Sequence, residues 1–277
     1  MTYSRICCIA IWALLAACTT PSERFDGMAQ EQGFHRTEVE GGDFSHVIYD
    51  NGKLGTSSTL HVYLGGDGTP WIGGFIIASD PTPRRPVTLK LMAMDKSPSL
   101  FLGRPCYHGY SDRHPCTPDY WTSARYSEDV IDSMARVLRK IMAEYGHTNL
   151  HLVGFSGGGG LAMLMAEKFP ETQSIVTIAG NLDVETWADL HGYDPLEGSK
   201  NPKSISPLPT TIRQYHLAGG KDSNIPPGII RDALINQPDS RYILFEDFTH
   251  ICCWEEIWQA VLACVADRCE GSHLSPR

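Results

Sequence analysis

A single serine in a glycine-rich stretch near the middle of the chain is the first candidate for chemistry. Residues 152–160 read Leu-Val-Gly-Phe-Ser-Gly-Gly-Gly-Gly, so Ser156 is the centre of a G-x-S-x-G pattern. A run typical of a strand, 149–155, precedes it, and a run typical of a helix, 157–168, follows. In that context the small residues permit a sharp turn. The turn exposes the hydroxyl at a helix N-terminus, where developing negative charge is favoured.

A phosphate-binding loop is the competing interpretation of these glycines. A Walker loop requires Lys followed by Ser or Thr after the glycines, and Leu161-Ala162 stand there instead. A dinucleotide-binding loop would follow the first strand, whereas this stretch lies mid-chain. We therefore predict that Ser156 is a nucleophile.

A serine nucleophile needs a general base, and four histidines follow Ser156. His250 comes directly after the last expected strand, 241–248, and before the last expected helix, 251–266, where a loop can return it to the serine. We predict His250 as the base. The others are interpreted as a surface histidine or substrate contact (His191), a core histidine within a strand (His216) and part of a polar tail (His273).

The base in turn needs an acid that orients it, and in the chain order Ser, Asp, His this acid lies between the two. Asp222 follows an expected strand, 211–219, and we predict that it holds His250. Asp183, after the strand expected at 174–180, is the alternative acid. Asp247 is too close to His250 along the chain and is interpreted as structural.

Acyl transfer also needs hydrogen-bond donors for the developing oxyanion. One is the backbone N–H of Gly157, directly after the nucleophile. The other is expected in the loop after the strand 59–64, where residues 65–68 read Gly-Gly-Asp-Gly, and we assign it to the N–H of Asp67 with Gly68 as alternate. The Asp67 carboxylate is expected to hydrogen-bond its own turn. A sharper hypothesis is that it faces a cationic group of the substrate.

The elements that must position these residues alternate between strands and helices. Helical periodicity over 127–145 begins at a capping Ser127 and ends at Gly146. This alternation predicts a mainly parallel sheet with helices on both faces. The segment 185–210 is rich in Pro, Gly and Ser, and we interpret it as a small cap-like excursion. The further elements expected are a hairpin at 35–50, strands at 59–64 and 87–95, and a helix at 226–236.

The N-terminus resembles a bacterial lipoprotein signal. Arg5 precedes the apolar run Ile6–Ala17, which is too short to span a bilayer and suits a signal peptide. The run ends Leu-Ala-Ala-Cys, similar to a lipobox, so we expect a signal peptide at 1–17 and lipidation of Cys18; an ordinary secretory signal is the alternative. Because Thr19 is not Asp, the resemblance implies outer-membrane sorting. We predict a tether at 18–33, one domain at 34–270 and a tail at 271–277.

Export permits disulfides, and six cysteines follow Cys18. Cys106 and Cys116 flank a turn-rich loop that they could close. Cys253 and Cys264 would lie about 16 Å apart along one helix, too far to pair. Cys264 with Cys269 is the easier pair, which leaves Cys252 and Cys253 as free thiols or a vicinal pair.

Composition excludes some classes of function. The chain has 277 residues, with 23 Lys and Arg against 32 Asp and Glu, and its densest basic spot, Arg84-Arg85, is interpreted as a loop end. Without a basic patch, nucleic-acid binding is not expected. The sequence has no C-x-x-C and no H-E-x-x-H pattern, so a metal site is not expected either.

Over residues 59–265 the chain resembles the α/β-hydrolase superfamily. Within it the chain is similar to uncharacterised exported bacterial hydrolases that share YLGGDGTPW, RPC, YWTSARYS, GFSGGGG and AGNLD. The resemblance implies an α/β-hydrolase fold and a serine hydrolase that acts through an acyl-enzyme without a cofactor. The expected substrate is a small carboxylic ester, at the bacterial cell envelope. A peptidase or amidase with the same triad and a non-catalytic binding module are the alternatives.

Overall fold

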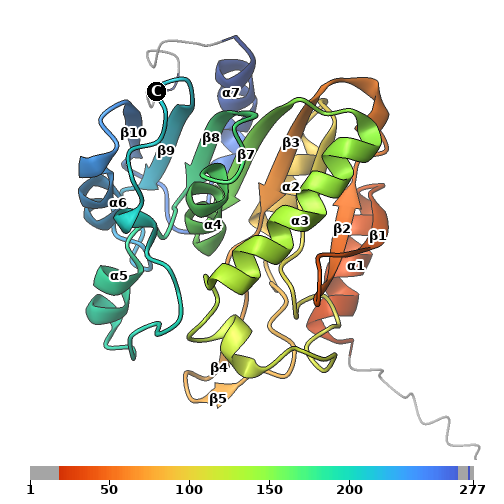
Figure 1. The fold of residues 1–277 in the computed structure, drawn as a ribbon. Coiled ribbons are helices and arrows are strands. Elements are labelled where there is room, and N and C mark those ends of the chain that lie inside the picture. Colours follow the sequence, from red (N-terminus) through yellow and green to blue (C-terminus); the bar gives the residue numbers. More distant parts are fainter. Residues whose placement is uncertain (1–18, 268–273, 275–277) are drawn as a thin grey trace, which may run out of the picture.

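The computed structural model describes residues 19–267 and Leu274, and a single large sheet runs through the fold. Its eight strands lie in the order β1-β2-β6-β3-β7-β8-β9-β10 (Figure 1). The six strands β6-β3-β7-β8-β9-β10 are parallel to one another, whereas β1 and β2 extend the β6 edge in antiparallel pairs. The strands are β1 His35–Glu40, β2 Ser45–Asp50, β3 Thr59–Leu64, β6 Ser99–Leu102, β7 Asn149–Phe155, β8 Thr172–Ile178, β9 Arg213–Gly219 and β10 Ser240–Phe245.

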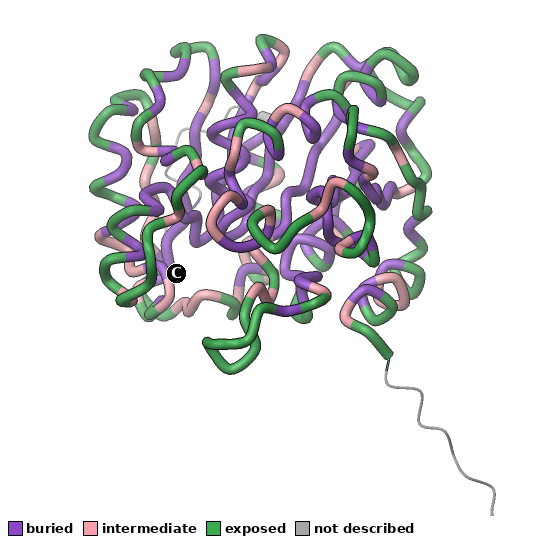
Figure 2. Tube along the Cα trace, turned by 60° about the horizontal axis from the view of Figure 1, so that its bottom comes forward, coloured by how far each residue is buried: buried purple, intermediate pink, exposed green. Residues whose placement is uncertain are grey.

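Helices cover both faces of this sheet. The helices α3, α4, α5 and α6 bury their apolar side chains against one face, and α1, α2 and α7 against the other. Buried residues fill the strands and the inner sides of the helices, while exposed residues lie on the outer turns (Figure 2). The helices are α1 Pro21–Glu31, α2 Val87–Ala93, α3 Glu128–Tyr145, α4 Gly157–Ala166, α5 Val184–His191, α6 Pro227–Ala233 and α7 Trp254–Asp267.

Several smaller elements complete the fold. A two-stranded hairpin, β4 Trp71–Ile72 with β5 Ile76–Ile77, projects between β3 and α2. The short 3₁₀ helices are Leu54–Thr56, Pro118–Trp121, Pro202–Ser204 and Leu234–Asn236. Within the described residues, no helix is both long enough and apolar enough to cross a membrane.

Most expected elements are present, and local sequence explains them. The Ser127 hydroxyl accepts from the N–H of Val130 at the start of α3, and Gly146 ends this helix with a left-handed backbone. The expected hairpin at 35–50 is β1 paired with β2. The excursion at 185–210 contains most of α5 and one of the 3₁₀ helices.

Two expectations about local structure are wrong. Residues 87–95 were expected to form a strand, but 87–93 form α2. The run begins Val-Thr-Leu-Lys-Leu, which alternates apolar and polar residues as a strand does, and so short a pattern does not separate a strand from a buried helix. The tether expected at 18–33 is helical over 21–31. A capping box between Thr20 and Glu23 starts this helix, and Phe25 is fully buried.

The helix α1 is therefore expected to stabilise the fold. Replacement of Phe25 by Ala removes a fully buried ring and should lower the free energy of unfolding by about 3–5 kcal/mol. Urea unfolding of residues 19–277, which contain every described element, measures this change. Gln30→Ala, on the exposed side of the same helix, is the matched control and should change little. Equal stability of the two variants would mean that 21–31 behaves as a tether after all.

Candidate active site

Ser156 lies on a sharp turn between β7 and α4. Its backbone has φ 53° and ψ −123°, a conformation that non-glycine residues rarely adopt. A side chain at Gly154 would approach the carbonyl oxygen of Gly158 to 2.1 Å, and one at Gly158 would approach that of Leu64 in β3 to 2.1 Å. The expected reason for these glycines, close packing of strand and helix around the turn, is thus what the structure shows.

The three residues predicted as nucleophile, base and acid lie in one hydrogen-bonded chain. The Nε2 atom of His250 is 3.1 Å from Ser156 Oγ, and its Nδ1 atom is 2.8 Å from Asp222 Oδ2. Asp222 Oδ1 accepts from the backbone N–H groups of Asn224 and Ile225, so the carboxylate is fixed and its side chain is fully buried. With Nδ1–H donating to Asp222, the Nε2 lone pair faces the serine hydroxyl.

Asn224 is a site residue that the sequence did not reveal. Its side-chain nitrogen lies 3.1 Å from His250 Nε2. This is the same imidazole nitrogen that faces the Ser156 hydroxyl. Its backbone oxygen accepts from Nε2 of His191 at 2.8 Å, which links α5 of the excursion to the acid loop. His191 thus positions the loop of Asp222. The only signal was the position of Asn224, two residues after Asp222.

The remaining candidate bases and acids do not lie in this chain of hydrogen bonds. Asp183 caps α5 by accepting from Thr186 N and pairs with Lys203 Nζ at 2.7 Å. Asp247 forms an exposed pair with Lys221. His216 is buried and bonded to Thr177, and burial lowers its pKa to about 3, as suits a neutral core histidine. His273 lies outside the described residues.

Asp67 does not have either role expected for its side chain. Its carboxylate lies 2.8 Å from Arg104 Nη2 and 3.0 Å from Arg125 Nη1, and it accepts from the Tyr126 hydroxyl. The Asp67 carboxylate therefore does not hydrogen-bond its own turn, and it is not available as a counter-charge for a cationic substrate. Burial alone would raise the pKa of Asp67, but the two guanidinium groups hold this pKa below its usual value.

This buried cluster lies directly beside the turn of Ser156. A side chain at Gly157 would approach Asp67 Oδ1 to 1.9 Å and the Tyr126 oxygen to 2.3 Å, so only glycine leaves room for the cluster. The Tyr107 hydroxyl also donates to the backbone oxygen of Asp67. Two buried guanidinium groups against one carboxylate leave a net charge of about +1 beneath the loop.

The loop 65–68 approaches the serine closely enough to supply an oxyanion donor. A side chain at Gly66 would come within 3.2 Å of Ser156 Cβ. None of the described residues accepts a hydrogen bond from the backbone N–H of Gly157 or of Asp67. Both groups assigned from the sequence are thus free to donate to a substrate oxygen.

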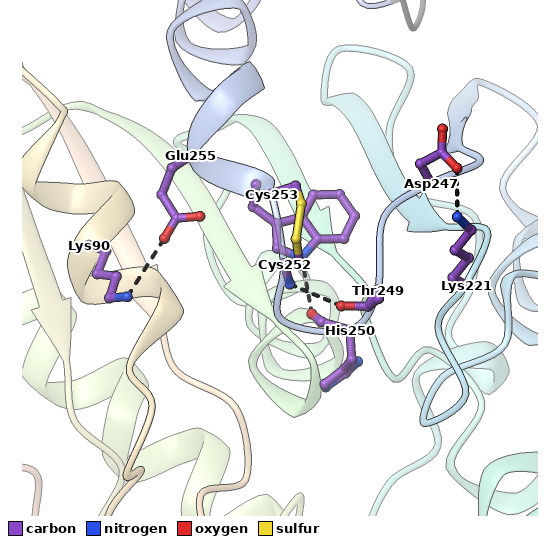
Figure 3. The surroundings of a disulfide bond; sticks show 9 residues. Lys90, Lys221, Asp247, Thr249, His250, Cys252, Cys253 and Glu255 are labelled. Atoms are coloured by element: carbon purple, nitrogen blue, oxygen red, sulfur yellow. Dashed lines mark hydrogen bonds and ion pairs between the residues drawn. A yellow bond between two sulfur atoms is a disulfide. The ribbon is translucent and has the colours of Figure 1, made fainter.

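Two disulfides are present among the described residues. Cys106 and Cys116 pair as expected and close the loop between them. Cys252 and Cys253, left open between free thiols and a vicinal pair, are bonded to each other beside His250 (Figure 3). Cys269 lies outside the described residues, so its pairing with Cys264 stays a prediction, as does lipidation of Cys18.

The loop around the vicinal pair holds the backbone of His250. Trp254 Nε1 donates to the His250 carbonyl oxygen at 3.0 Å, and the N–H of Cys252 donates to Thr249 Oγ1 (Figure 3). The ring of His250 also packs on Phe155, with centroids 4.9 Å apart. These contacts limit the positions that the imidazole can take.

The serine opens into a cavity of about 1040 Å³. Its walls come from the loop 65–70, the hairpin, the segment 83–88 and the excursion. A cavity of this volume has room for a substrate larger than a short ester. The described residues contain no group of three or more His, Cys, Asp or Glu side chains that could hold a metal ion. The arrangement suits nucleophilic attack by Ser156 with His250 as base.

The role found for Asp183 predicts a pH-dependent contribution to stability. Burial opposes its ionisation, but the bonds from Lys203, Asn201 and Thr186 lower its pKa to about 2. Because this pKa lies below the unfolded value, the contribution is complete above about pH 5 and is lost as pH falls toward 2.

Asp183→Asn should therefore lower the free energy of unfolding by about 1–2 kcal/mol at pH 7 and by roughly half as much at pH 3. Urea unfolding at the two pH values measures it, with the exposed Asp189→Asn of the same helix as control. A loss that does not depend on pH would contradict the ion pair as its source.

Asp67 is expected to be essential for the stability of the buried cluster. Asp67→Asn leaves Arg104 and Arg125 buried without a counter-charge, which should lower the free energy of unfolding by about 3 kcal/mol. Thermal and urea unfolding measure the loss, and the exposed Asp119→Asn serves as control. A change below about 0.5 kcal/mol, as for an ordinary surface residue, would contradict this role.

Comparison with known proteins agrees with this architecture. Residues 105–200 match the family model described as alpha/beta hydrolase fold. No curated protein sequence is similar enough to the chain to match it.

Solved structures show the same arrangement of elements at low sequence identity. An esterase from Pyrococcus furiosus superposes with a TM-score of 0.59 and 13% identity, over 87% of this chain and 94% of that one. An alpha-beta serine hydrolase homologue from Coxiella burnetii superposes with a TM-score of 0.55 and 11% identity, over 85% and 97%. The eight-stranded sheet of this chain, with Ser156 on the turn between β7 and α4, is thus an α/β-hydrolase fold.

Proposed function

We propose that this protein is a serine hydrolase that cleaves carboxylic esters through an acyl-enzyme. The observation that carries the proposal is the hydrogen-bonded chain from Ser156 through His250 to Asp222, in which Ser156 and His250 line the cavity. A binding module has no need of a strained serine aligned with a base and a buried acid. The likeness to an esterase and to a serine hydrolase homologue supports the same reaction class.

The first step is attack by Ser156. His250 Nε2 takes the proton from Ser156 Oγ as the oxygen bonds to the substrate carbonyl carbon, and Asp222 stabilises the imidazolium that results. Asn224 then has to move its amide away from Nε2, because a protonated nitrogen no longer accepts. The imidazolium returns its proton to the leaving alkoxide, and water releases the acyl group by the reverse sequence.

The oxyanion is held by the loop 65–68 and the start of α4. The N–H groups of Gly157 and Asp67 donate to it: Gly157 directly follows Ser156, and Asp67 belongs to the loop whose Gly66 lies close to Ser156 Cβ. The cluster of Asp67 with Arg104 and Arg125 adds a net positive charge beneath these donors, which favours the negative oxygen. Ester cleavage is the default because an alkoxide leaves more readily than an amine.

We also propose that the protein is exported and anchored by a lipid on Cys18 in the bacterial cell envelope, at the outer membrane. The apolar run Ile6–Ala17 and the Leu-Ala-Ala-Cys that ends it support this location. The disulfide between Cys106 and Cys116 is of a kind that persists in oxidising compartments.

Covalent labelling by a fluorophosphonate tests the proposed function. The wild-type protein should bind one equivalent at Ser156, and Ser156→Ala should bind none. Asp222→Asn should label at least about a hundredfold more slowly, since the wrong tautomer of His250 then faces the serine. Mass spectrometry of the intact protein measures the adduct.

The same experiment has a control variant and a comparison that separates an esterase from an amidase. Asp183→Asn keeps the triad and should label at the wild-type rate. The p-nitrophenyl acyl esters should be cleaved faster than the matching aminoacyl p-nitroanilides; the reverse order would indicate an amidase. A folded wild-type protein that never labels would overturn the proposal in favour of a binding module.

A further inference from the structure

The hairpin of β4 and β5 exposes an unusual amount of apolar surface. Residues 71–77 read Trp-Ile-Gly-Gly-Phe-Ile-Ile, and all five large side chains are exposed, from 41% for Ile77 to 75% for Phe75. Trp71 pairs with Ile77 and Ile72 with Ile76, and because successive side chains of a strand point to opposite faces, apolar side chains cover both faces of the hairpin around its Gly-Gly turn. We call this segment, 71–77, the apolar hairpin. A patch of this kind marks an interaction surface.

The apolar hairpin lies at the mouth of the active-site cavity. Trp71 and Gly74 form part of the cavity wall, and Phe75 and Ile76 lie outside it. The N–H of Ala78 donates to the carbonyl oxygen of Pro70 and closes the base of the hairpin. The hairpin projects from the lower edge of the molecule in Figure 1, beyond the carboxyl ends of the parallel strands.

The start of the described chain is tied to the same edge. Ser22, near the beginning of α1, donates from both its N–H and its hydroxyl to Asp80, three residues after the hairpin. Only Thr19 and Thr20 separate α1 from Cys18, and the apolar run Ile6–Ala17 precedes that cysteine. Three extended residues reach about 10 Å, so an anchor on residue 18 would hold this edge against a membrane.

The charge on the hairpin side of the cavity fits an anionic lipid surface, whereas the exposed Asp194 lines the same cavity from the excursion. Arg84 and Arg85 are exposed, follow the hairpin and line the same cavity, although the chain as a whole has a formal charge of −9. Asp80, the nearest acid along the chain, is engaged by Ser22 and by the N–H of Thr82. A second copy of the chain would bring two such arginine pairs together, which disfavours a symmetric dimer through this face.

We propose that the apolar hairpin inserts into the surface of a membrane that contains anionic phospholipid. Its aromatic and branched side chains enter the boundary between headgroups and acyl chains, while Arg84 and Arg85 contact the headgroup phosphates. The cavity then opens onto the lipid. The substrates, which rest on the proposed function, are acyl esters of amphiphiles held in that membrane.

Binding to vesicles tests the insertion directly. Residues 19–277 contain every described element and lack the lipid anchor, and Trp71 is the one exposed tryptophan among them, since the other four are at most 8% exposed. With vesicles of phosphatidylethanolamine and phosphatidylglycerol brominated on the acyl chains, the tryptophan emission should be quenched. Trp71→Phe should remove this quenching while the protein still sediments with the vesicles.

Matched variants locate the contact. Phe75→Ser/Ile76→Ser should weaken partitioning into the vesicles by at least about tenfold, because two exposed apolar groups no longer enter the lipid. Ile235→Ser removes a side chain that is 77% exposed, close to the 75% of Phe75, from the 3₁₀ helix after α6, and should leave partitioning unchanged. Urea unfolding should show wild-type stability for both variants.

Three results would overturn the proposal: no sedimentation with vesicles, an equal loss for Ile235→Ser, or a dimer that the double variant converts to a monomer without vesicle binding. A protein that binds vesicles but resists the fluorophosphonate keeps the membrane contact and contradicts the hydrolase. A protein that reacts with the fluorophosphonate but does not bind vesicles supports the hydrolase and contradicts the membrane contact.

The assignment of the substrates has its own test. The Phe75→Ser/Ile76→Ser variant should slow cleavage of an ester embedded in vesicles at least about fivefold and leave cleavage of a soluble short-chain ester unaffected. Equal effects on both esters would overturn the assignment of the substrates.

Discussion

The turn between β7 and α4 constrains the rest of this structure. It holds Ser156 at a positive φ, and the backbone of α4 approaches β7 and β3 so closely that residues 154 and 158 must lack side chains. Such a conformation is unfavourable in isolation and persists only because the surrounding sheet and helix determine it. The hydroxyl then lies at the N-terminus of α4, 3.1 Å from His250 Nε2 and at the wall of the cavity.

The buried charges of Asp67, Arg104 and Arg125 are the second determinant of the site. Burial of charged groups is unfavourable, so their mutual pairing and the Tyr126 hydroxyl are needed to keep them in place. They connect the loop 65–68 to the segments around 104 and 125, which lie far away in sequence. The cluster fixes the backbone N–H of Asp67 next to the serine turn and contributes positive charge there. Loss of the cluster would therefore affect both the stability of the fold and the position of this N–H group.

The N-terminal helix α1 ties the start of the described chain to the core and to the edge that carries the apolar hairpin. Phe25 of α1 reaches into the core and forms part of the cavity wall, and Ser22 is bonded to the segment that follows the apolar hairpin. A flexible tether would leave the orientation of the domain free. A packed helix that starts within three residues of Cys18 would instead restrict which edge of the domain lies against a membrane, if the proposed lipid anchor is attached there. The vicinal disulfide and Trp254 restrict the loop of His250 in a comparable way.

The sequence by itself determined many of the strands and helices, the serine turn and the residues that form the hydrogen-bonded chain, because periodicity, glycine spacing and chain order are local signals. It did not separate α2 from a strand, since a short apolar run suits either structure. The partners of Asp67, the contact of Asn224 with His250 and the helix at 21–31 packed on the core were decided only in three dimensions. Each depends on side chains brought together from distant segments, and no local pattern records such contacts.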